Sequence, residues 1–257
     1  MVSERYLLYI DILGFSELVK TGSDKLHGLF TLIDSLNAHK HGDFQTIVFS
    51  DTIIVFNKAI VQNQHDHEYI VMYACEFVQD LLHRCIELEI QFRAILTYGE
   101  FQYEKLANIE TYHGKALIDC YHKEKNIDAI GLFIDKKILK YNRYFASAQF
   151  DIELQFIYLT KSIERLYKST GGEFHVDSFT VEQTFDLCDY PQEVMFLKIL
   201  KINLDSQINS KIRSKYLHTY HYYKSRYSNL IERLEDVDFD FRIISPGADW
   251  SDYNLSK

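Results

Sequence analysis

The sequence is poor in residues that cross-link or interrupt a chain. Its 257 residues include two prolines, one tryptophan and four cysteines. The cysteines form no C-x-x-C pair and no zinc-like spacing, which excludes a disulfide framework and a zinc site and predicts reduced, mostly buried thiols. No apolar run approaches the roughly 20 residues that cross a bilayer, and the first residues do not form a signal peptide. These absences predict a soluble, cytoplasmic protein with no membrane segment.

Positive charge is also scarce. Lys and Arg number 28 against 37 Asp and Glu, for a formal net charge of −9. This balance argues against nucleic acid or an anionic membrane as the partner, because both are bound through clustered Lys and Arg. A small anionic ligand held by a metal ion is compatible with it. The contents of 47% hydrophobic and 25% charged residues are those of a globular chain, and the length allows one large domain or a domain with an appended lobe.

The first half of the chain shows regular hydrophobic patterns. Residues 6–12 form an apolar strand, and residues 15–36 carry apolar side chains at helical spacing. Residues 43–57 predict a hairpin with Ser50 and Asp51 at its tip. A helix over 65–88, a strand over 91–97 that Gly99 ends, a helix over 114–126 and a strand over 129–134 complete the pattern. The prediction is an α+β palm with a βαββαβ core, whose helices pack on one face of a mainly antiparallel sheet.

The pattern is less regular after about residue 145. We therefore predict a first domain over 1–145 and a helical C-terminal lobe over 146–257. Residues 152–167 and 208–234 are predicted to be helical, and 194–204 is either a strand or a helix. Four tyrosines at helical spacing form an aromatic stripe that indicates core or dimer packing: Tyr216, Tyr220, Tyr223 and Tyr227.

Two aspartates are the strongest candidates for chemistry. Asp11 lies inside an apolar strand, where a carboxylate needs a cation or hydrogen-bond donors, and Asp51 lies at the hairpin tip beside that strand. Each alone has an ordinary structural explanation, as a buried acid satisfied by backbone donors or as a turn residue. Together they predict a site for one or two divalent cations, with the Ile12 carbonyl as a further ligand. The amides of Gly14, Phe15 and Ser16, where the helix begins, are candidates for binding phosphate.

Four segments resemble class III nucleotidyl cyclases in order and spacing. They are Asp11-Ile-Leu-Gly-Phe-Ser16, Phe49-Ser-Asp51, Arg93-Ala-Ile-Leu-Thr-Tyr-Gly99 and Gly114-Lys-Ala-Leu. The resemblance covers about residues 5 to 136, and within the superfamily it is nearest to the Pycsar-type pyrimidine cyclases of bacterial anti-phage defence. It implies that a homodimer with composite sites cyclises UTP or CTP, and that Asp11 and Asp51 hold two Mg²⁺ or Mn²⁺ ions. It also implies that Arg93 binds phosphate; an ion pair with an acid such as Glu100 is the alternative.

The chain departs from the purine cyclases at two places. Where those enzymes carry an Asn and a transition-state Arg, this sequence has Ile118 and His122, so His122 and Lys115 are the candidate substitutes. A surface position is the ordinary interpretation of His122.

The second departure concerns the base. Where purine cyclases use a Lys or Glu, this sequence has Ile47, and the polar candidates near it are Gln45, Thr46 and Thr97. The alternatives to a pyrimidine cyclase are a purine cyclase with an unusual base pocket and a catalytically inactive cyclase-like regulatory module. His65 and His67 have a metal-like spacing, but their polar surroundings indicate the start of a helix.

Overall fold

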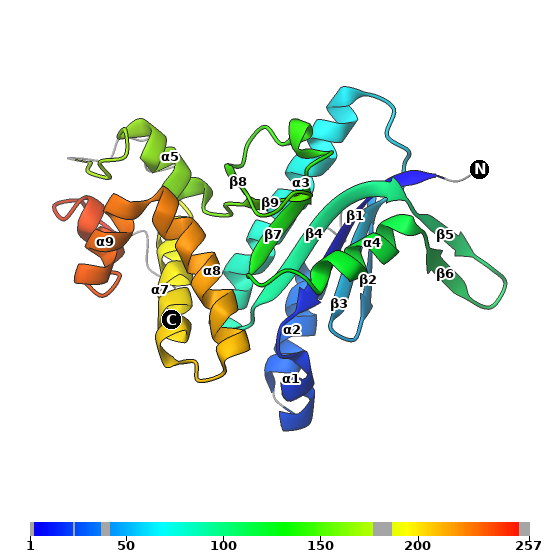
Figure 1. Cartoon of the computed structure of the whole chain (residues 1–257), viewed down its shortest axis with the longest axis horizontal. Coiled ribbons are helices and arrows are strands. Elements are labelled where there is room, and N and C mark those ends of the chain that lie inside the picture. The colour runs from blue at the N-terminus through cyan, green and yellow to red at the C-terminus, as the bar shows by residue number, and fades with distance from the viewer. Residues whose placement is uncertain (1–2, 23, 37–41, 177–186, 252–257) are drawn as a thin grey trace. The chain divides into compact units, whose positions relative to one another are not determined.

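The computed structural model describes residues 3–22, 24–36, 42–176 and 187–251 (Figure 1). The chain forms two compact units, Met1–Leu159 and Thr160–Lys257. The division lies beyond the predicted boundary at residue 145 because two short strands, β8 (Ser147–Gln149) and β9 (Leu154–Ile157), pair with the sheet of the first unit.

A seven-stranded sheet forms the centre of the first unit. Its strand order is β2-β3-β1-β4-β7-β9-β8. Among the described strands of this sheet, only the β4–β7 pair is parallel, which confirms the predicted α+β class with a mainly antiparallel sheet. The remaining bounds are β1 Glu4–Ile12, β2 Phe44–Phe49, β3 Thr52–Asn57, β4 Phe92–Glu100 and β7 Gly131–Asp135.

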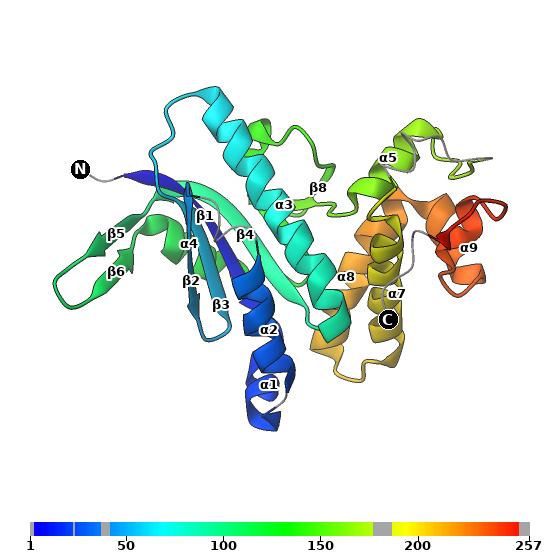
Figure 2. The same ribbon diagram turned by 180° about the vertical axis from the view of Figure 1, so that it is seen from behind.

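Helices cover both faces of this sheet. Helix α3 (Gln64–Leu88) lies on one face and α4 (Lys115–Glu124) on the other, as the two opposite views show (Figures 1 and 2). The expectation that all helices share one face is wrong. The physical reason lies in the central strand: five consecutive residues of β1, Tyr6 to Ile10, are buried, so both of its faces need a cover.

Three local predictions need correction. The helix predicted over 15–36 is two helices, α1 (Phe15–Thr21) and α2 (Asp24–Ser35), because Gly22 takes a left-handed conformation and caps α1. Gly99 does not end its strand but lies within β4, where it pairs with Arg5. The hairpin of β5 (Gln102–Lys105) and β6 (Glu110–His113), which precedes α4, was not predicted from the sequence.

The second unit is helical. It contains α5 (Lys161–Ser169), α7 (Tyr190–Ser206), α8 (Ser210–Arg226) and α9 (Ser228–Asp236). Residues 194–204 are therefore helical, whereas 152–167 is not one helix but β9 followed by α5. Tyr220, Tyr223 and Tyr227 of the predicted stripe are buried, which confirms its packing role within this unit. In neither unit does a described helix have the length and apolarity needed to span a membrane.

Candidate functional site

Two aspartates lie at the same end of adjacent strands. Asp11 is the penultimate residue of β1 and pairs across the sheet with Thr52 of β3. Asp51 precedes Thr52 in the tight turn between β2 and β3, where Ser50 takes a positive φ of 57°. The Ile12 amide donates to the Asp51 carbonyl at 2.9 Å, which extends the ladder into the turn. The hairpin therefore lies beside the first strand, as predicted. It brings both residues to the same edge of the sheet, meaning the edge formed by the ends of the strands.

Each of the two terminal nitrogens of the Arg93 guanidinium has two acceptors, whereas the buried Nε has none among the described residues. Its Nη2 donates to Asp11 Oδ2 at 2.8 Å and also contacts the Glu124 carboxylate. Its Nη1 donates to the carbonyls of Glu124 and Ile127 at 3.1 and 2.9 Å. The side chain is only 10% exposed. The structure thus pairs Arg93 with Asp11 and Glu124, whereas Glu100, the acid suggested from the sequence, lies 3.6 Å from Lys115.

The pKa of the Tyr9 phenol is affected by the negative charges around Asp11. Tyr9 shares a face of β1 with Asp11, and its hydroxyl lies 3.4 Å from the Thr52 hydroxyl. Burial raises the pKa of Tyr9, and the negative charges of Asp11, Glu124 and Asp51 raise it further, while the hydrogen bond with Thr52 opposes them. Three carboxylates therefore act on one phenol.

The donor set fits a hard divalent cation that arrives with part of its own coordination shell. The Asp51 carboxylate has no hydrogen-bond or ion-pair partner among the described residues, although the Asp51 backbone carbonyl accepts from Ile12, so this carboxylate can accept a cation. No group of three or more His, Cys, Asp or Glu that could hold a metal occurs in the described ranges. Mg²⁺ commonly uses one or two carboxylates together with substrate phosphates and water. Asp11 and Asp51, with the predicted Ile12 carbonyl, fit that kind of site.

The predicted phosphate-binding amides follow directly after β1. Gly14 takes a left-handed conformation, with φ of 73°, and α1 begins after it without a side-chain cap. The Gly14 carbonyl accepts from the amides of Glu17 and Leu18. The amides of Gly14, Phe15 and Ser16 have no hydrogen-bond partner within the part of the chain that the structure describes. They are therefore available to an anion.

Strand β2 presents two of the base-binding candidates on the face that carries Asp11. Ile47 pairs with Ile54, which in turn pairs with Tyr9. Gln45 is on the same face and its amide interacts with the Tyr112 phenol. Thr46 is on the opposite face, and its buried hydroxyl has no partner among the described residues.

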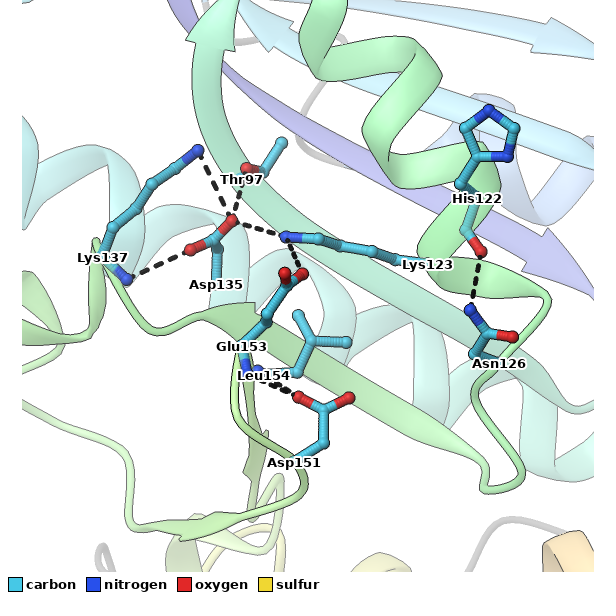
Figure 3. Close-up of polar contacts among 9 residues, drawn as sticks. All are labelled: Thr97, His122, Lys123, Asn126, Asp135, Lys137, Asp151, Glu153 and Leu154. Atoms are coloured by element: carbon cyan, nitrogen blue, oxygen red, sulfur yellow. Dashed lines mark hydrogen bonds and ion pairs between the residues drawn. The ribbon is translucent and has the colours of Figure 1, made fainter.

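Thr97 takes part in a different cluster. Its hydroxyl donates to the Asp135 carboxylate at 3.2 Å, and Lys123 bridges Asp135 and Glu153 at 2.9 and 3.2 Å (Figure 3). Burial opposes ionisation of Asp135, but the hydrogen bond from Lys123 and other contacts lower its pKa. Thr97 is therefore bonded to the buried acid of a partly exposed ion-pair network.

The two candidate substitutes for a transition-state arginine are on the outside of α4. The Lys115 side chain is 81% exposed, and His122 is exposed with its ring directed away from the Asp135 cluster (Figure 3). Ile118 is 56% exposed on the same helix. Within one chain, no described contact joins Lys115 or His122 to either aspartate.

Two residues of this site, Tyr9 and Glu124, were not predicted from the sequence. Tyr9 carried a signal, because residues two apart on a strand share a face. Glu124 carried none, since its contact with Arg93 depends on how α4 packs over β4.

His67, proposed only as part of a helix start, stacks on Tyr141 at 4.3 Å between ring centroids, and its Nδ1 lies 2.6 Å from the Tyr6 hydroxyl.

No family model matches the chain, and no curated protein matches it. Among solved structures, the chain is similar to the catalytic core of a rhodopsin-guanylyl cyclase with converted specificity in complex with ATPαS, at 14% identity and a TM-score of 0.48, over 61% of this chain and 96% of that chain. It is also similar to the dimeric guanylyl cyclase domain of the RhoGC fusion protein from the aquatic fungus Blastocladiella emersonii (16%, TM-score 0.46, 60% and 94%) and to the adenylyl cyclase CyaB from P. aeruginosa (12%, 0.41, 62% and 95%). At these TM-scores the likenesses carry no conclusion about activity.

Proposed function

We propose that this protein is a nucleotidyl cyclase that converts UTP, or CTP, to the 3′,5′-cyclic monophosphate and pyrophosphate. One observation carries the proposal: Asp11 and Asp51 lie at one edge of the sheet, joined through the Ile12–Asp51 hydrogen bond of 2.9 Å. Shortly after Asp11, the amides of Gly14, Phe15 and Ser16 have no partner among the described residues. This arrangement supports the proposal that two carboxylates hold cations beside amides that bind phosphate.

The residues have distinct tasks in this reaction. Asp11 and Asp51 would hold two Mg²⁺ or Mn²⁺ ions, which when bound supply positive charge for the ribose 3′-oxygen and the triphosphate. The amides of Gly14, Phe15 and Ser16 would orient phosphate oxygens. The 3′-hydroxyl gives its proton to solvent water, its oxygen bonds to the α-phosphorus in line, and the bond to the bridging oxygen breaks, so that pyrophosphate leaves.

The expected preference for a pyrimidine base rests on the β2 side chains that lie on the same face of the sheet as Asp11. Ile47 lies on the Asp11 face and has neither donor nor acceptor for the edge of a purine base. A site that lacks this readout cannot select adenine or guanine through paired polar groups. Gln45 is the polar residue of the same strand on that face, although its amide already interacts with Tyr112. We therefore expect UTP to exceed ATP and GTP, with CTP as the closest competitor.

A second chain would complete the site. Lys115 and His122 lie on the exposed side of α4, so in a two-fold dimer they would contribute to the partner's phosphate site. Such a homodimer has two composite sites. A role as a second-messenger synthase in the bacterial cytoplasm, in anti-phage defence, is supported by the sequence resemblance alone.

One observation favours a second candidate, a cyclase-like regulatory module without activity. A buried acid without compensation is costly, but Arg93 already compensates Asp11. Retention of Asp11 therefore does not by itself require a metal ion.

Product analysis separates these candidates. The full chain is incubated with an equimolar mixture of the four ribonucleoside triphosphates and Mn²⁺, and the products are identified by mass. Cyclic UMP as the main product supports the proposal. Cyclic AMP or cyclic GMP as the main product would establish a purine cyclase instead, and no cyclic product under Mn²⁺ saturation would favour the regulatory module.

A further inference from the structure

The contact between Arg93 and Asp11 raises an electrostatic problem for a cation site. A guanidinium 2.8 Å from a carboxylate offsets its charge and repels an approaching divalent cation. Asp11 can attract a cation only if something else balances Arg93. The same nitrogen that donates to Asp11, Nη2, also contacts the Glu124 carboxylate.

Glu124 is well placed to balance this charge. It is the last residue of α4, and its side chain is 12% exposed, close to the 10% of Arg93. The other guanidinium nitrogen, Nη1, donates to the carbonyls of Glu124 and Ile127. Carbonyls at the end of a helix carry partial negative charge, so the backbone favours the cationic group as well. The carboxylate and the carbonyls at the end of α4 therefore hold the Arg93 guanidinium in place and offset its positive charge.

Resting on the cyclase function proposed above, we propose that Glu124 and Arg93 act as a buried positioning pair for Asp11. Arg93 fixes one oxygen of the Asp11 carboxylate, and Glu124 neutralises Arg93, so that the edge retains its attraction for a cation. The three carboxylates Asp11, Asp51 and Glu124 with one guanidinium leave two negative charges, which match one divalent cation. Without the charge of Glu124, only one remains.

This inference gives Arg93 a role different from phosphate binding. The Arg93 guanidinium is almost inaccessible to solvent. To contact a phosphate, it would have to give up its contacts with two carboxylates and two carbonyls. Arg93 and Glu124 act through Asp11, and neither touches substrate. Their replacement should therefore change cation binding in the absence of any nucleotide.

Glu124→Gln tests the pair, because it keeps the shape of the side chain and removes its charge. Mn²⁺ binding to the full chain is measured by electron paramagnetic resonance without nucleotide. Loss of a residue that supports a metal ligand typically weakens metal binding by about 10- to 100-fold, so we expect the Mn²⁺ dissociation constant to rise by about tenfold. Asp119→Asn is the matched control: it removes the same charge from an exposed position of α4, and we expect a change below about twofold.

A double variant keeps the test decisive if Glu124→Gln folds poorly. Arg93→Met combined with Glu124→Gln removes both charges and restores the two negative charges at Asp11 and Asp51. We expect its Mn²⁺ affinity to stay near that of the wild type and, where Glu124→Gln folds, to exceed that of the single variant, while turnover stays low because Asp11 is no longer positioned. Thermal unfolding by circular dichroism verifies the fold of each variant.

The outcomes distinguish this inference from the proposed function. Equal Mn²⁺ affinities of Glu124→Gln and Asp119→Asn would overturn the positioning role, and so would wild-type protein that binds no Mn²⁺. A loss of metal-free UTP binding in Glu124→Gln as large as the loss of Mn²⁺ binding would show that the pair serves phosphate instead. If the wild-type protein forms no cyclic nucleotide and Glu124→Gln still lowers Mn²⁺ affinity tenfold, the positioning pair is supported and the cyclase proposal is refuted.

Discussion

Gly114 is the residue at which a single methyl group should disturb the candidate site most. It precedes α4 with a φ of 153°, which side-chain-bearing residues rarely adopt. A Cβ atom there would lie 2.3 Å from the Glu100 carbonyl oxygen and 2.7 Å from the Phe101 Cα. Both contacts are with backbone, so relief requires movement of α4 or of the end of β4. The helix that carries Lys115 and Glu124 would then shift.

The expected cost of Gly114→Ala follows from these two effects. Backbone strain of this kind costs about 1–3 kcal/mol and overpacking a similar amount, so we expect a loss of about 3 kcal/mol. For a unit of this size that corresponds to a fall in Tm of about 6–12 °C. Thermal unfolding by circular dichroism provides the measurement, and loss of turnover is expected to accompany it.

Gly99→Ala is the matched control for this prediction. Gly99 lies in β4, and an added Cβ would meet only the Ala116 Cβ at 3.6 Å, an ordinary contact. We expect a change within about 1 kcal/mol, because the smaller entropy of the unfolded chain offsets any crowding. Equal Tm values for the two variants would refute the steric reasoning about the approach of α4 to β4.

Three further predictions concern the metal site, the dimer and the second unit. Asp11→Asn and Asp51→Asn should each reduce turnover by at least about a hundredfold while the circular dichroism spectrum is unchanged, since each removes one cation ligand; near-native turnover of either variant would disprove the assignment. Mixing Asp11→Asn subunits with subunits changed at both Lys115 and His122 should restore part of the activity through one intact composite site, and a fully active monomer would contradict this. Burial raises the pKa of Glu193 to about 8 from 4.5, so the folded protein binds this proton more tightly than the unfolded chain, and stability should fall as pH rises from about 4.5 to 8. Glu193→Gln should flatten that slope in Tm measured between pH 5 and 8, and an unchanged slope would assign the pH dependence to other groups.

Much of the first unit was predictable because its signals are local. The strand before Asp11, the hairpin with Ser50 and Asp51, and the helix now seen over Gln64–Leu88 all follow from short-range hydrophobic periodicity and turn chemistry. The break at Gly22 was missed because the apolar pattern continues on both sides of it. The strands β8 and β9 were missed because three or four residues are too few for a period to be recognised.

The second unit shows why an apolar run can remain ambiguous. Residues 194–204 fitted a strand or a helix, since apolar residues also occupy the exposed side of the segment, where Ile202 is 52% exposed, and so obscure its period. In the structure this segment is within α7, whose buried residues include Val194, Phe196, Leu197 and Leu200. The surrounding helices decide the conformation.

The sequence by itself determined the identity and order of the chemical groups: Asp11 after an apolar strand, Asp51 in a turn, Gly14 before a helix and an arginine in a later strand. Only the tertiary structure decided what those groups do to one another. Arg93 is 82 residues from Asp11 in sequence, and Glu124 is 31 residues from Arg93, yet one guanidinium joins them. Their contact depends on the register of β1 with β4 and on the packing of α4 over that pair. Such long-range geometry is set by the burial of the whole sheet, and no spacing along the chain encodes it.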